Sequence, residues 1–167
     1  MPTSSDSPGV SAEGGPRPAP GSELLEVLTV GLPFCVFKAG VGLWALGRGW
    51  TGLAAPLLLL AAADALLNAV NLGTLLALRR RVVSACVLSA VTSRWSPFPR
   101  STHGWLVDFG NALDVALSFA LVAGMVGSGV LGEFPAPWLR AWNAAVVLNV
   151  LGAGLGRMGS TLERLPR

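Results

Sequence analysis

Residues 52–81 read GLAAPLLLLAAADALLNAVNLGTLLALRRR. Asp64 is the one charged residue of this stretch before the three closing arginines. A helix needs about 20 mostly apolar residues to cross the roughly 30 Å of hydrocarbon in a bilayer. The stretch is long enough for this, so it predicts a transmembrane helix over residues 52–78.

The composition of the whole chain agrees with a membrane location. Of 167 residues, 52% are hydrophobic and only 13% are charged, against about 25% charged in a typical soluble domain. The formal net charge is +3, but the basic residues flank apolar blocks. They therefore indicate membrane orientation, and we expect no nucleic-acid partner.

Working outward from residues 52–78, apolar blocks recur on both sides. The sequence predicts an all-α membrane protein with four transmembrane helices in two hairpins, at about residues 24–46, 52–78, 105–131 and 138–158. These helices form one transmembrane domain over residues 22–158.

The remaining segments are predicted to lie outside the membrane. Residues 1–21 are rich in Pro, Gly and Ser, which predicts a disordered tail. Residues 79–104 form a loop and residues 159–167 a short polar tail. Within the loop, residues 82–93 are apolar but too short to span comfortably. They either continue the second helix or lie along the membrane surface.

The distribution of basic residues predicts the orientation. With four crossings, nine arginines fall on the side of the two tails and the middle loop, two fall on the opposite side, and Lys38 lies within the first helix. Cytoplasmic segments carry the excess of Lys and Arg. We therefore expect both termini in the cytoplasm. The abundance of Gly, Ala, Leu and Arg favours a bacterial inner membrane.

Two charged residues are predicted to meet near the middle of the bilayer. Lys38 lies fourteen residues after Leu24, and Asp64 lies fourteen residues before Leu78. At about 1.5 Å of rise per residue the two are level, on helices joined by a short turn. We expect an ion pair, which either fixes the helix register or titrates in a transport path; the residues also leave open that they do not pair.

Further polar residues suggest a second layer. It comprises Asn68, Asn71, Asp114 and Asn149, which lie seven to ten residues from the predicted inner ends of their helices. Asp64, Asn68 and Asn71 follow the i, i+4, i+7 spacing of one helix face. This layer is either interhelical hydrogen bonding that holds the bundle or a site for a ligand, proton or cation.

Asp108 and Arg157 lie close to the predicted inner interface, where they could pair. Cys35 and Cys86 are predicted to be free thiols. No motif for catalysis, for a cofactor or for a metal is visible.

The leading interpretation is a structural, accessory or regulatory inner-membrane component without catalytic activity. Its expected partners are membrane lipids and either further copies of itself or another membrane protein. The alternative is a subunit of an oligomeric proton or cation transporter or channel that uses the intramembrane Asp and Asn residues. A second alternative is a lipid-modifying membrane enzyme that uses Asp108 and His103.

Overall fold

The computed structural model describes residues 20–84, 86–94 and 103–162, and all regular elements in these ranges are helical. The predicted all-helical class is confirmed for this part of the chain. The predicted tails at 1–21 and 159–167 lie mostly outside it. In chain order the helices are α1 (Pro20–Glu26), the π-helical η1 (Val27–Gly31), α2 (Leu32–Gly47), α3 (Thr51–Leu78), α4 (Val87–Arg94), α5 (His103–Gly127), the short 3₁₀ turn η3 (Val130–Glu133) and α6 (Ala136–Leu162).

Three helices in the described part are long and apolar enough to cross a membrane: Gly21–Gly47, Thr51–Leu78 and Trp105–Gly127. The first of these joins α1, η1 and α2 into one rod. The helix α6 has 27 residues but is not among the three, because it contains Asn143, Asn149 and arginines near both ends.

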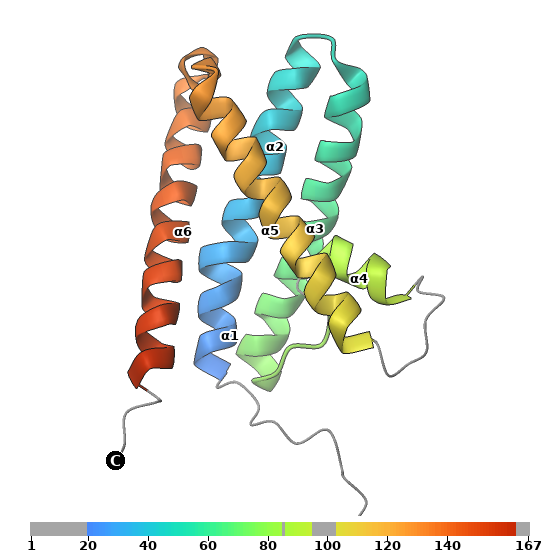
Figure 1. Ribbon diagram of the computed structural model, residues 1–167, viewed down its shortest axis with the longest axis vertical. Coiled ribbons are helices and arrows are strands. Elements are labelled where there is room, and N and C mark those ends of the chain that lie inside the picture. Colours follow the sequence, from blue (N-terminus) through green and yellow to red (C-terminus); the bar gives the residue numbers. More distant parts are fainter. Residues whose placement is uncertain (1–19, 85, 95–102, 163–167) are drawn as a thin grey trace, which may run out of the picture.

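The long helices lie side by side and define two ends of the molecule (Figure 1). At the tail end, α1 and α5 begin while α3 and α6 end. At the hairpin end, the chain turns at residues 48–50 and 128–135. The helix α2 is central, because it packs against α3, α5 and α6. Figure 1 shows α5 crossing this array obliquely.

The helix α3 buries polar side chains and exposes apolar ones, which is the reverse of a helix in a soluble protein. Its buried stripe includes Asp64, Asn68 and Asn71, whereas Leu59 and Leu66 are 71% and 66% exposed. In water this arrangement would hide the polar groups and expose the apolar ones. In lipid it is favourable, because polar side chains there face the interior of the protein.

A break in the first helix explains how α6 is attached to it. Pro33 has no backbone N–H, so it cannot donate to the carbonyl of Thr29, four residues earlier. The side chain of Asn149 on α6 donates to that carbonyl instead, with 3.1 Å from Nδ2 to O. Gly152 lets the helices approach this closely, because a Cβ built there would lie 2.0 Å from Oγ1 of Thr29.

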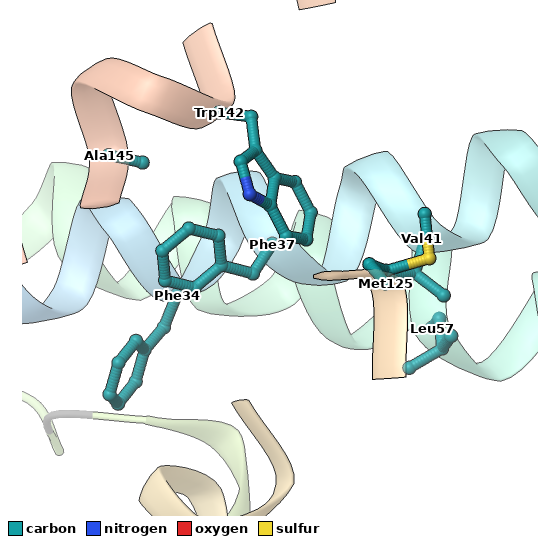
Figure 2. Packing of buried hydrophobic residues seen from close by; sticks show 7 residues of the cluster. All are labelled: Phe34, Phe37, Val41, Leu57, Met125, Trp142 and Ala145. Atoms are coloured by element: carbon teal, nitrogen blue, oxygen red, sulfur yellow. The ribbon is translucent and has the colours of Figure 1, made fainter. Parts of the chain in front are cut away.

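The apolar core lies mainly toward the hairpin end (Figure 2). The ring of Trp142 is 1% exposed and lies 4.9 Å from that of Phe37, centroid to centroid. Phe134 meets Trp142 edge-on at 5.7 Å. The turns beyond this core need two glycines in the left-handed region, Gly49 and Gly129, with φ of +76° and +73°.

Candidate functional site

A buried cluster of three charged side chains lies between α2, α3 and α5. Lys38 on α2 contacts Asp64 on α3, with 2.5 Å between Nζ and Oδ2, and it also contacts Oδ1 of Asp114 on α5. The three residues are 0%, 2% and 5% exposed. The ion pair expected between Lys38 and Asp64 is therefore present, and Asp114 is a second carboxylate on the same ammonium group.

Sequence reasoning placed Asp114 in a lower layer and missed this contact. Side chains on a helix lean toward its N-terminus. The N-terminus of the α1–α2 rod is at the tail end, so the long side chain of Lys38 extends down toward Asp114. Asp114 and Ser118 share a polar helix face, which indicates that Asp114 points into the bundle. Counting residues along the helix axes does not reveal its contact with Lys38, because the count ignores the length of the lysine side chain.

The second oxygen of Asp64 holds the start of α4. Its Oδ1 accepts a hydrogen bond from the backbone N–H of Val87, at 2.7 Å. The first N–H groups of a helix have no partner within that helix and form its positive end, which favours a carboxylate. Asp64 thus ties α4 to the same cluster that holds Lys38.

The chain reaches this point by folding back along α3. The helix α3 ends where Arg79 adopts a left-handed conformation, with φ of 52°. The carboxamide of Asn71 then donates to the carbonyl of Ser84, at 3.1 Å, and accepts from the N–H of Val83, at 3.3 Å. Non-helical backbone at membrane depth requires such partners. Asn71 therefore supports the returning segment.

The returning segment does not continue α3, because Val83 and Val87 contact side chains of α3. That residues 82–93 lie along the membrane surface stays a prediction. The helix α4 of this segment packs on α5. A Cβ built at Gly110 would lie 2.5 Å from Cα of Ser89, and Thr92 donates to the carbonyl of Leu106 at 2.9 Å. The sequence does not predict the packing of α4 on α5, because these contacts use backbone groups, which are the same at every residue.

The other predicted polar residues bind backbone groups. Asn68 donates to the carbonyl of Asp64, at 2.9 Å, and lies against the backbone of η1, where a Cβ at Gly31 would meet its Oδ1 at 2.2 Å. Asn149 donates to the carbonyl of Thr29 on η1. That these residues form one layer stays a prediction.

The predicted pair of Asp108 and Arg157 is not described, because the side chain of Arg157 lies outside the described residues. Asp108 itself is exposed. The side chain of His103 is likewise outside the described set. Both thiols, Cys35 and Cys86, are free and buried.

A cavity of about 100 Å³ leads from the tail end to the charged cluster. Its lining includes the exposed Glu26, which pairs with Arg81 at 3.2 Å, and the buried Asp114. Further residues of the lining are Val27, Val30, Gly31, Phe34, Asn68, Cys86, Asn111 and Val115. A space of this size with polar groups along it has room for several water molecules.

Among the described side chains, no group of three or more His, Cys, Asp or Glu is arranged to hold a metal ion. Comparisons with protein families, with curated proteins and with solved structures found no match to this chain. The fold and the site define an all-helical protein with three helices suited to cross a membrane and a buried Lys–Asp–Asp cluster among them.

Proposed function

We propose that the chain is a subunit of an oligomeric proton or cation transporter or channel, with Lys38, Asp64 and Asp114 as its ion site. The observation that carries the proposal is the charge of the cluster. Two buried carboxylates share one ammonium, so the fully ionised cluster has a net charge of −1. Buried charge without a partner is strongly unfavourable, which favours binding of a further positive charge.

Two features around the cluster support this function over simple packing. The cavity connects Asp114 with Glu26 and Arg81 near the tail end. The start of α4 lies at Asp64, where the N–H of Val87 donates to Oδ1, so the charged cluster is also tied to the end of a helix. A pair that only fixed helix register would need neither feature.

We also propose the finer topology. Four crossings place both termini and the middle loop in the cytoplasm of a bacterial cell, within the inner membrane. The length of α6 and its contacts with η1 and α2 support its role as the fourth crossing. The tail end would then face the cytoplasm, as the excess of arginines there favours. Four helices are few for a pore within one chain, so the transporting unit is an oligomer.

A structural or accessory role is the second candidate, and the asparagines favour it. Asn68, Asn71 and Asn149 all donate to backbone carbonyls. The contact of Asn149 joins α6 to η1, and none of the three contacts needs a ligand. This role requires no transport and predicts that neutral variants of the cluster leave the function intact.

The test is ion flux in liposomes that contain the purified full chain. An imposed K⁺ diffusion potential drives proton entry, which a trapped pH-sensitive dye reports; other cations are tested by exchange in the outer buffer. We expect flux above protein-free vesicles for the native chain and none for Asp114→Asn. Asp108→Asn is the matched control, because Asp108 is an exposed aspartate on the same helix.

Folding of each variant is checked by gel filtration and by its helical circular dichroism. No flux from folded native protein, or equal flux from the native chain and Asp114→Asn, would overturn the proposal and leave the accessory role in front.

A further inference from the structure

The two aspartates on Lys38 differ in how fully their oxygens are occupied. Asp64 uses Oδ2 for Lys38 and Oδ1 for the N–H of Val87. Asp114 uses Oδ1 for Lys38, and no donor among the described residues reaches its Oδ2. One carboxylate is therefore fully engaged in holding the structure, while the other has an oxygen available to a bound species.

The cavity reaches only the second of these carboxylates. Asp114 is part of its lining, whereas neither Lys38 nor Asp64 is. Water that enters past Glu26 and Arg81 thus meets Asp114 before the other members of the cluster. The available oxygen and the route to it belong to the same residue.

A buried hydroxyl lies one helical turn beyond Asp114 on the same face of α5. Ser118 is 0% exposed, and its Oγ has no hydrogen-bond partner among the described residues. A buried polar group without a partner is unfavourable, and in a native protein it calls for an explanation such as a functional role or a bound water. A hydroxyl can donate to a carboxylate or accept from a carboxylic acid or a water molecule, so Ser118 suits a site whose protonation changes.

The surroundings of Asp114 favour a proton over a metal cation. A metal ion on this carboxylate would need further ligands, and no group of three or more His, Cys, Asp or Glu among the described side chains could hold one, whereas a proton on Oδ2 needs no further ligand. The titratable and charged groups around Asp114 and along its cavity come from α2, α3, the returning segment and α1. They are Lys38, Asp64, Cys35, Cys86, Glu26 and Arg81.

Resting on the proposed transport function, we infer that the exchanged ion is a proton and that Asp114 is the group that takes it up. The proton passes from water in the cavity to Oδ2 of Asp114, which changes the net charge of the cluster from −1 to zero. Release to water reverses the step. Asp64 is a positioning residue that keeps Lys38 and the start of α4 in place.

The test is chemical labelling of the full chain in liposomes with dicyclohexylcarbodiimide, a lipid-soluble reagent that reacts with protonated carboxyl groups in apolar surroundings. Peptide mapping by mass spectrometry locates the adduct. We expect the adduct on Asp114, with labelling that declines as the pH is raised. Asp114→Asn should abolish this adduct, and Asp108→Asn should leave it unchanged.

The role of Asp64 is tested in the same assay. Its carboxylate repels a negative charge on Asp114, so Asp64→Asn should move the labelling profile of Asp114 to lower pH. Asp64→Glu, which keeps the charge, should restore the profile. A merely structural loss would lower the amount of folded protein without moving the profile.

An adduct mainly on Asp64, or labelling of Asp114 that does not depend on pH, would overturn the inference. Labelling and flux separate the two proposals. Labelling of Asp114 as expected with no flux would refute transport but keep the proton site, and flux with labelling elsewhere would keep transport but refute the role of Asp114.

Discussion

The tail half and the hairpin half of the molecule are built on different principles. On the tail side of Lys38, the buried asparagines bind backbone groups. On the hairpin side, most of the core is a cluster of large apolar side chains around Trp142 (Figure 2). The difference shows that the buried asparagines lie on one side of the Lys–Asp–Asp cluster and most of the large apolar core on the other.

Removing the ammonium group of Lys38, which lies between the two halves, should destabilise the protein most. Lys38→Met keeps a similar length but leaves Asp64 and Asp114 buried without a cation. Breaking a buried ion pair by removing one partner costs about 3–5 kcal/mol, so we expect the largest loss of stability here. Thermal unfolding in detergent, followed by circular dichroism, measures it.

The control for that variant is the triple change Lys38→Met, Asp64→Asn and Asp114→Asn, which removes all three charges and should regain much of the lost stability. A Lys38→Met protein that unfolds at the native temperature would show that the cluster is not held by its charges.

The two aspartates give the next largest difference. Asp64→Asn removes a partner of Lys38 and weakens the contact with Val87, so we expect a loss of about 2–4 kcal/mol and faster hydrogen exchange in residues 83–89. Asp114→Asn leaves one ammonium with one carboxylate, and its loss should stay below about 1 kcal/mol. Hydrogen-exchange mass spectrometry compares the two, and equal protection of residues 83–89 in both would contradict the assignment of Asp64 to α4.

The close approach of α6 to η1 is tested by comparing two glycine variants of α6. Gly152→Ala places a methyl group where Thr29 lies 2.0 Å away, so we expect a loss of about 1–3 kcal/mol from overpacking. Gly154→Ala, with nothing within 4 Å, is the matched control and should be neutral or slightly stabilising. The melting temperatures of the two variants give the comparison, and similar values would mean that α6 does not approach η1 as closely as described.

The smallest expected effect lies at the hairpin end. The indole N–H of Trp44 and the guanidinium of Arg48 hold the pKa of Glu133 below its ordinary value. A lowered pKa in the folded state stabilises it above the pKa of the unfolded chain, and this contribution is lost as the pH falls through the folded value. Because the pair is exposed, the effect is small and weakened by salt. The melting temperature of Glu133→Gln should lie slightly below that of the native chain at neutral pH and should equal it in acid. A difference that grows in acid would refute this.

The sequence predicts the helices well because length and hydropathy decide them. It also predicts the pair of Lys38 and Asp64, since a short turn makes their helices neighbours and fixes their relative height. It does not predict the return of residues 82–87 along α3. That path depends on Asn71 and Asp64 binding backbone N–H and C=O groups, and backbone groups are the same at every position of the sequence.

The contact of Asp114 with Lys38 was missed for a related reason. It depends on the oblique course of α5 (Figure 1) and on the direction of a long side chain. The hydropathy of the sequence predicts neither the course of α5 nor the direction of this side chain. The bond from Asn149 to the π-helical segment could not be anticipated either, because it joins residues 120 positions apart.

The measurement that tests the division between the halves most directly is the access of a thiol in the cavity from each side of the membrane. Cys86 is part of the lining of the cavity, and Cys35→Ala leaves it as the single thiol. Silver ion is added to oriented liposomes from either side in chloride-free buffer, and the remaining free thiol is counted with a maleimide after denaturation. We predict that Cys86 is blocked only from the side that carries the termini. Blocking from the hairpin side, or from neither side, would contradict a cavity that admits water from the tail end only.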